Sequence, residues 1–286
     1  MIFFLYALCA SYEEYKKCKD MRFCRENIDK VEKWTLKPLD FSNNQFYGQL
    51  FKNETDDELN LVIYLMQENS FRIQFLPKNQ ENFPRYKVSE NKHVINQDII
   101  SKHLPLKYNL AETVTLTSDK CKAEINLSPF YITITDEFNS TVYINRNQNL
   151  IFEHTGQKVE PDLWPYYRND TIKNGATSTG IDFAFKGSNT RISGFAEADN
   201  SINFDDTLEE PRRFSNYDSF SDYGHIPLVY GHSSSEMISI FWLNPTDTYL
   251  RIKTDTEQNT RNVRILSEGG YADIIVFTGK INSILD

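Results

Sequence analysis

The sequence predicts an all-β protein built as one large antiparallel β-sandwich. Segments with strand patterning follow one another along the chain, short polar turns separate them, and only two segments, 12–32 and 96–104, have helix-prone sequences. Strands joined by hairpins pack as two face-to-face sheets. No repeat, low-complexity tract or long linker divides the 286 residues. We therefore expect a single large sandwich rather than two small domains.

The composition is typical of a folded protein and excludes several partners. Hydrophobic residues make up 40% of the chain and aromatic residues 14%, which is enough to bury a core. The net charge is -9 and the isoelectric point is about 5.2, and no cluster of Lys and Arg interrupts the acidic balance. Nucleic acids and anionic membranes bind basic patches. Neither is expected as a partner.

Residues 1–10, "MIFFLYALCA", predict a secretory signal peptide cleaved near Cys9 or Ala10. The segment is a short apolar run that ends in small residues before the polar "SYEEYKK". A first strand or a buried N-terminal segment is the alternative. No later apolar run is long enough to span a bilayer, so no membrane insertion is expected. We expect a mature chain inside the secretory pathway.

The segment 11–40 precedes the predicted sandwich and contains "CKDMRFC". Cys18 and Cys24 are close enough in sequence to close a small disulfide loop in an oxidising compartment. A zinc site would need two more thiols or histidines at matching spacing, and none is nearby. Cys121 is expected to be an unpaired thiol beneath a sheet.

The strands of the predicted sandwich, 41–286, begin with a hairpin. In 71–77, "FRIQFLP", apolar residues alternate with Arg72 and Gln74, as in a half-buried strand. The apolar run 59–66 precedes it, and "QENS" forms the turn between them. Further strands are expected at 114–118, 122–136, 140–146, 150–154, 181–187, 226–232, 238–244, 248–254, 262–269 and 272–279. The sequences "DEFNS" and "NRNQN" are expected to be turns.

Carboxylates in glycine- and aromatic-rich loops are the candidate site residues. They occur in "GFAEADNSINF" (194–204), just after it, and in "FSNYDSFSDYGH" (214–225); they are Glu197, Asp199, Asp205, Asp206, Asp218 and Asp222. Carboxylates bind sugar hydroxyls beside aromatic rings that cover the apolar sugar face. The alternative is a solvated acidic loop above buried aromatic side chains. The five histidines show no metal-binding spacing, so no metal site is predicted.

Four N-glycosylation sequons agree with a chain in the secretory pathway. They are Asn53, Asn126, Asn139 and Asn169. Because an Asn-rich sequence produces sequons by chance, each alone is a weak signal. Asn126 falls within a strand-like run, where a glycan is least expected.

Taken together, these segments resemble the N-terminal part of the alpha subunits of endoplasmic-reticulum glucosidase II, in glycoside hydrolase family 31. "CKDMRFC" is similar to the family's N-terminal cysteine loop, and "GFAEADNSINF" is similar to its G-x-x-E-x-A-D-x-L segment. The stretches "FRIQFL", "SPFYITITD" and "NLIFEH" also resemble it. So do "DYGHIPLVYGHSSSEMISIFWLNPTDTYLRI" and "SEGGYADIIVFTG". The likeness covers nearly the whole chain.

The resemblance implies a galactose-mutarotase-like supersandwich that packs on a catalytic (β/α)8 barrel. In the family a loop of this domain reaches over the mouth of the barrel, which implies that Glu197 and Asp199 lie at the rim of a sugar pocket. It further implies that Asp218 holds a sugar hydroxyl and is not the nucleophile. The partners implied are a glucosylated N-glycan, a barrel and a glucosidase II beta-type subunit, in the endoplasmic-reticulum lumen, with no cofactor.

The sequence departs from the family because the nucleophile motif W-x-D-x-[NE] and the barrel are absent from these 286 residues. Retaining hydrolysis needs two carboxyl groups about 5 Å apart, so we expect no catalytic residue in this chain and no hydrolysis by it alone. A free-standing lectin-like module in the secretory pathway is the alternative. A sugar epimerase ranks last, because its only acid–base pair, Glu153 and His154, would point to opposite faces of a strand.

Overall fold

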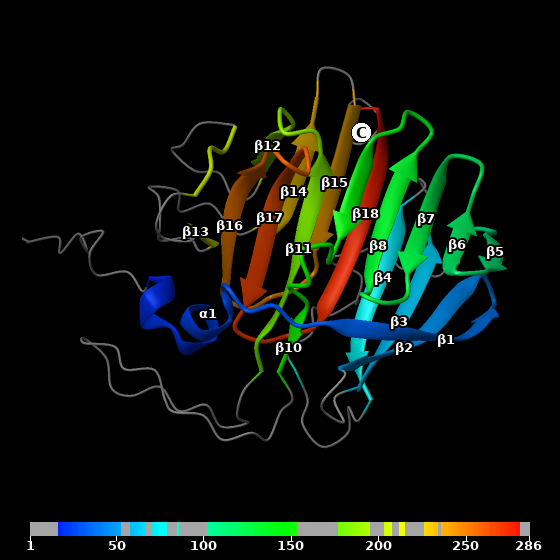
Figure 1. Ribbon diagram of the computed structural model, residues 1–286, viewed down its shortest axis with the longest axis horizontal. Helices are drawn as coiled ribbons and strands as arrows, with labels where there is room; N and C mark the ends of the chain where they lie inside the picture. The colour runs from blue at the N-terminus through cyan, green and yellow to red at the C-terminus, as the bar shows by residue number, and fades with distance from the viewer. Residues whose placement is uncertain are drawn as a thin grey trace, which may run out of the picture.

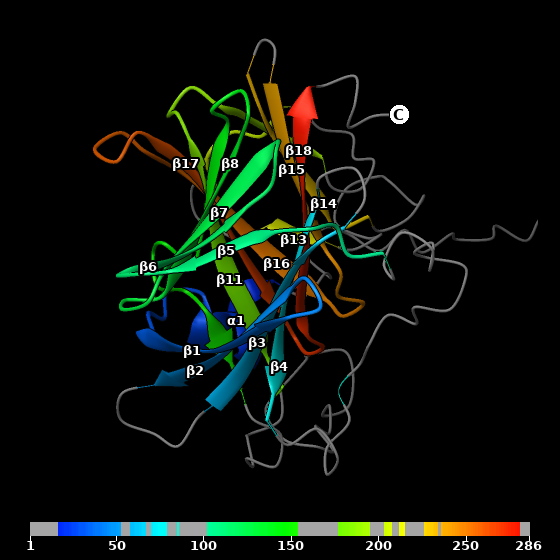
Figure 2. The same ribbon diagram turned by 90° about the vertical axis from the view of Figure 1, so that its right-hand side faces the viewer.

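Two antiparallel sheets pack face to face, which confirms the predicted all-β sandwich (Figures 1 and 2). The computed structural model describes residues 17–52, 58–66, 70–78, 85, 102–153, 177–194, 203–207, 212–214, 226–233 and 236–280. The predicted signal peptide and most of the helix-prone segment 96–104 lie outside these ranges. Within them, no helix is long and apolar enough to cross a membrane.

One sheet has eight strands and joins both halves of the chain. Its order is β1 (Trp34–Ser42), β2 (Gln45–Lys52), β3 (Glu58–Leu65), β4 (Phe71–Pro77), β18 (Ala272–Lys280), β15 (Glu236–Trp242), β14 (Leu228–His232) and β12 (Arg191–Gly194). The predicted hairpin is β3–β4, with Ile63 opposite Ile73. Ile73 in turn faces Ile274 of β18. The inward residues of β4 are fully buried, as the alternation predicts.

The second sheet has ten strands and faces the first across the core. Its order is β13 (Arg212–Phe214), β16 (Thr248–Asp255), β17 (Thr260–Ser267), β11 (Thr179–Lys186), β9 (Thr141–Ile144), β8 (Tyr131–Asp136), β7 (Cys121–Asn126), β6 (Thr113–Thr117) and β5 (Lys107–Leu110), with β10 (Ile151–Phe152) beside β11. Cys121 is buried in the core and is not disulfide-bonded, as expected.

The run 122–136, read from the sequence as one strand, is a hairpin. β7 and β8 pair with Asn126 opposite Tyr131, and the turn 127–130 separates them. The turn contains Pro129, which has no N–H to donate to a ladder. Pairing the two halves places Ile125 opposite Ile132, and both are fully buried. Alternation continues on both sides of the turn, which hid the break.

The predicted boundary of the sandwich at residue 41 is wrong, because β1 begins at Trp34. The indole of Trp34 is fully buried and donates a hydrogen bond to Leu150 O at 2.9 Å. Two backbone bonds, Leu36 N to Leu127 O and Phe130 N to Trp34 O, also tie β1 to the opposite sheet. Polar residues later in β1 obscured the strand pattern.

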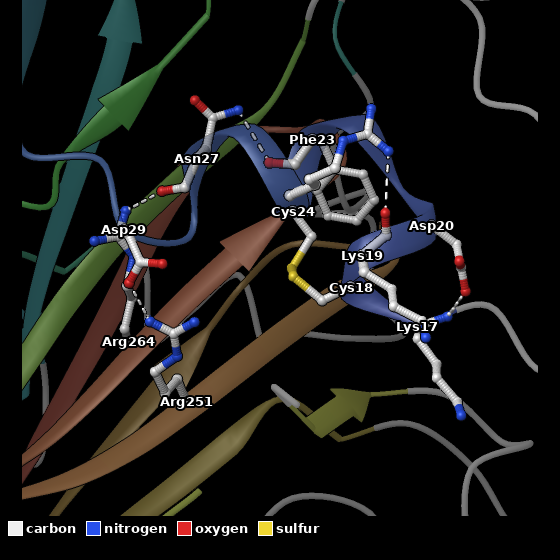
Figure 3. Close-up of a disulfide and its surroundings, with 11 residues drawn as sticks. Lys17, Cys18, Lys19, Asp20, Phe23, Cys24, Asn27, Asp29, Arg251 and Arg264 are labelled. Carbon is white, nitrogen blue, oxygen red and sulfur yellow. Dashed lines mark hydrogen bonds and ion pairs between the residues drawn. A yellow bond between two sulfur atoms is a disulfide. The ribbon is translucent and has the colours of Figure 1, made fainter. Parts of the chain in front are cut away.

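The N-terminal segment forms a small disulfide-closed element, here called the N-terminal disulfide loop, on the outer face of the ten-stranded sheet (Figure 3). Cys18 and Cys24, the pair that the sequence predicts, are bonded across a 3-10 turn (Cys18–Asp20) and helix α1 (Arg22–Asn27). The ring of Phe23 lies 5.7 Å from that of Tyr249 in β16. In the described part of the helix-prone segment 12–32, residues 17–32, helix is confined to this 3-10 turn and α1.

The N-terminal disulfide loop and the turn after β9 together bury the outer face of strand β11. Asp182 of β11 points outward yet is only 1% exposed, and its carboxylate accepts the backbone N–H groups of Asn147 and Asn149. The neighbouring Arg264 of β17 donates to the carbonyl oxygens of Asn27 and Lys30. The N-terminal disulfide loop and the turn after β9 thus cover the outer face of the sheet at this point.

Candidate carbohydrate-facing rim

The predicted rim residues Glu197, Asp199 and Asp218 lie outside the described residues. The structure does describe the two points between which the acidic loop runs. One is Gly194, the last residue of β12, and the other is the segment 203–207, which we call the rim segment. How these two points are held decides where the loop can reach.

The loop starts at Gly194 because only glycine fits there. Its φ is +112°, a conformation that L side chains rarely adopt, and a Cβ atom at this position would lie 2.3 Å from Leu228 O. Gly194 pairs with Val229 of β14. The chain can therefore remain against β14 and still turn out of the eight-stranded sheet at this residue.

The rim segment begins at the same strand but crosses to the other sheet. Phe204 N donates to Ile192 O of β12 at 2.7 Å, and the Arg261 guanidinium of β17 donates to Phe204 O at 2.9 Å. The Phe204 side chain packs against the core. Three residues later, Thr207 N donates to Ile252 O of β16.

Asp206 fastens the rim segment to β16 and is a structural carboxylate. Its two oxygens accept the backbone N–H and the hydroxyl of Thr254 at 2.8 and 2.9 Å, and Arg261 lies 3.3 Å away. Asp205 is exposed and has no partner among the described residues. Of these two candidate carboxylates, only Asp205 is available to a ligand.

Asn203 is a residue that the sequence analysis did not single out. Its side-chain Oδ1 is buried and accepts no hydrogen bond from the described part of the chain. Buried acceptors are normally satisfied, so this oxygen is an exception at the start of the rim segment. An asparagine in a polar loop carries no sequence signal for such an environment.

The buried carboxylates elsewhere in the fold have structural partners. Glu153 accepts two hydrogen bonds from Arg22, at 3.0 and 2.9 Å, and one from Ser178 N. Although burial raises the pKa of Glu153, these bonds outweigh it and lower the pKa to about 2. A carboxylate with that pKa is a weak base, which argues against the Glu153–His154 acid–base pair; His154 lies outside the described residues.

Burial raises the pKa of Asp182 to about 6, but that carboxyl group is sealed from solvent. Among the described residues, no group of three or more His, Cys, Asp or Glu side chains could hold a metal ion.

Gly194→Ala tests whether the loop depends on this backbone conformation. We expect it to lower the free energy of unfolding by about 2–3 kcal/mol, because the new Cβ adds positive-φ strain to a clash with a backbone carbonyl. The matched control is Gly187→Ala, at a φ of +98°, where Cβ would meet only the Thr190 hydroxyl at 2.9 Å. Urea unfolding of both variants is the measurement. Equal losses would show that the Leu228 contact does not restrain the loop.

Comparisons with known proteins agree on one family. Residues 60–250 match the family described as the glycosyl hydrolase 31 N-terminal galactose mutarotase-like domain. Glucosidase 2 subunit alpha of Saccharomyces cerevisiae is 29% identical over 236 residues, which cover 73% of this chain and 24% of the relative. Neutral alpha-glucosidase AB of Dictyostelium discoideum is 31% identical over 135 residues, 41% of this chain and 14% of the relative.

Solved structures show the same fold. A crystal structure of the endoplasmic-reticulum glucosidase II heterodimer, its catalytic subunit with the binding domain of the regulatory subunit, superposes with a TM-score of 0.78 at 21% identity. It covers 93% of this chain and 36% of that chain. A dextranase of the same family from Flavobacterium johnsoniae gives 0.54 at 14% identity, covering 87% and 26%. This chain thus spans about a quarter to a third of the length of such proteins.

Proposed function

The chain belongs to glycoside hydrolase family 31 through its N-terminal galactose mutarotase-like domain, and on this premise we propose that it serves a glucosidase II alpha-like α-glucosidase that trims glucose from N-glycans in the endoplasmic reticulum. Its relatives bear the names glucosidase 2 subunit alpha and neutral alpha-glucosidase. Structures similar to it hold Glc1Man2 and alpha3-Glc2. The domain contacts carbohydrate and supports a catalytic barrel, without being catalytic by itself.

One observation carries the proposed role of the acidic loop. Its start at Gly194 is fixed on β14, and its return at 203–207 is fixed on β12, β16 and β17, so the loop is anchored to both sheets. A loop whose ends are fixed loses less conformational freedom on binding, which favours a sugar site. Glu197 and Asp199 of this loop would accept hydrogen bonds from sugar hydroxyls. Asp218, in the separate segment 214–225, would do so on the leaving-group side.

The catalytic carboxyl pair belongs to the barrel in this proposal. Its reaction needs no metal or organic cofactor, because two carboxyl groups suffice for glycoside hydrolysis. The glucosidase II heterodimer among the similar structures contains a regulatory subunit, so a beta-type subunit is the second partner proposed.

A hybrid enzyme tests the proposal. This chain replaces the matching 24% of the yeast glucosidase 2 subunit alpha, and hydrolysis of an α-1,3-linked glucose disaccharide is measured. We expect an active hybrid in which Asp218→Ala lowers kcat/KM by about 10- to 100-fold, the worth of a hydrogen bond to a charged group. Asp119→Ala, at an exposed carboxylate of the β6–β7 turn, is the control and should leave the rate unchanged.

Two results would contradict the proposal. One is an active hybrid that is indifferent to Asp218→Ala, Glu197→Gln and Asp199→Asn. The other is tight binding of the same disaccharide by the isolated 286-residue chain, which would identify a free-standing lectin-like module instead. Calorimetric titration of the isolated chain provides this second measurement.

A further inference from the structure

A pocket of about 100 Å³ lies at the opposite end of β12 from the acidic loop. Its wall is formed by the β8–β9 turn, the β11–β12 connection between the two sheets, and the end of β14. Lys186, Thr190 and His232 contribute polar side chains. A single water needs about 10–15 Å³ on this measure. The pocket can therefore take several atoms of a polar group such as one sugar ring.

The floor of the pocket is apolar and closely packed. Phe185 of β11 and Ile238 of β15 are each 2% exposed. A Cβ atom on Gly231 of β14 would lie 2.1 Å from the Phe185 ring, so this ring packs directly on the Gly231 backbone and leaves no room for a side chain there. This contact closes the pocket below and leaves its polar wall facing outward. An apolar floor with a few polar groups is typical of a small-ligand site.

The sequon residue Asn139 lies in the wall of this pocket. It is exposed in the β8–β9 turn with a φ of +64°, and its backbone N–H donates to Asp136 O at 3.1 Å. Thr141, the third residue of the sequon, donates its hydroxyl to Asn139 O at 3.2 Å. The Asn139 side-chain amide has no hydrogen-bond partner among the described residues.

The other described sequon, at Asn126, differs from this one because its side-chain amide has a hydrogen-bond partner and because it lies outside the pocket. Asn126 lies at the end of β7, and its Nδ2 donates to Pro129 O at 2.6 Å inside the β7–β8 hairpin. Asn126 does not line the pocket. It therefore serves as an internal reference for a glycan with no recess beside it.

We propose that Asn139 carries an N-linked glycan and that its first N-acetylglucosamine lies in this pocket. Transfer forms the bond between Asn139 Nδ2 and sugar C1 and breaks the bond from C1 to the pyrophosphate of a lipid-linked oligosaccharide. The pyrophosphate leaves with the electron pair, and the amide releases one proton. The hydroxyl and acetamide groups of the sugar then meet Lys186, Thr190 and His232. The inference rests on the proposed localisation, because this donor acts in the endoplasmic-reticulum lumen.

Two forms of the full chain separate localisation from the site. One keeps its own N-terminus, and the other carries an established secretory signal in front of residue 11; both are expressed in a eukaryotic secretory cell. Enzymatic release of the glycan converts its Asn to Asp, so peptide mass identifies the occupied sequons. We expect occupancy of Asn139 in both forms and its loss in Asn139→Gln. Glycosylation of only the second form would contradict the localisation and leave the site intact.

The pocket is tested by an endoglycosidase that cuts between the two core N-acetylglucosamines. We expect its cleavage at Asn139 to be at least tenfold slower on native than on urea-denatured protein, because the first sugar is recessed. His232→Ala and Lys186→Ala should shorten this delay, and any glycan at Asn126 should show none. An unoccupied Asn139 in the signal-bearing form, or equal native and denatured rates, would overturn the proposal.

Discussion

Replacing Asp273 with alanine is expected to lower the free energy of unfolding by about 3–5 kcal/mol, the usual cost of leaving one partner of a buried ion pair unpaired. Arg72 of β4 and Asp273 of β18 are 1% and 5% exposed and meet through two hydrogen bonds, at 2.9 and 2.6 Å. Gln74 Nε2 also donates to the Asp273 carboxylate, at 2.9 Å. The loss of this partner adds to the cost.

The pair also joins distant parts of the chain, because β4 and β18 are neighbours in the eight-stranded sheet. The exposed pair Lys122–Glu124 is the control, with side chains 43% and 44% exposed; Lys122→Ala should change stability by at most about 1 kcal/mol. Urea unfolding measures both. A double variant, Arg72→Met with Asp273→Leu, should recover most of the loss. Losses of similar size in Asp273→Ala and Lys122→Ala would show that the buried pair has no special role.

Glu153→Gln is expected to lower the free energy of unfolding by about 3 kcal/mol at pH 7. It should also make the free energy of unfolding fall less steeply as the pH is lowered. Desolvation raises the pKa of Glu153, but its bonds to Arg22 and Ser178 lower it to about 2 from an ordinary 4.5. At about 1.4 kcal/mol per pKa unit, the shift corresponds to about 3 kcal/mol. Because the folded pKa is the lower one, this stability is present above pH 4.5 and is lost as pH falls toward 2.

Urea unfolding at pH values from 7 to 2.5 checks the prediction. The control is Glu26→Gln, which removes the other carboxylate bound to Arg22, at 3.2 Å, from a side chain that is 52% exposed; we expect a change of at most about 1 kcal/mol. Titration of Asp182 does not affect the comparison between variants, because this residue is present in all of them. Its raised pKa makes its own contribution fully present below pH 3.8 and lost as pH rises through about 6. If the free energy of unfolding depended on pH in the same way in the wild type and in Glu153→Gln, the stabilising role of the Arg22–Glu153 pair would be refuted.

The sequence indicated where the acidic loop begins, but not which of the nearby carboxylates have structural partners. Glycine followed by acidic residues marked the loop at 194–204, and the structure shows that Gly194 is required by backbone geometry. The sequence could not separate Asp205 from Asp206, since adjacent carboxylates look alike until one of them meets Thr254 and Arg261. The unpaired oxygen of Asn203 gave no signal, because it depends on which groups surround it after folding.

By itself the sequence determined the fold class, the disulfide and many of the strands, because period-two alternation, turn residues and a six-residue cysteine separation are local properties. It did not predict the strands β1, β2, β5, β12 and β13. Only the tertiary structure decided that β1 begins at Trp34, that 122–136 forms a hairpin, and that the N-terminal disulfide loop covers β17. Each of these depends on residues far apart in the chain, as when Trp34 donates to Leu150 O or Arg264 to Asn27 O. Such contacts exist only once the two sheets have closed on each other.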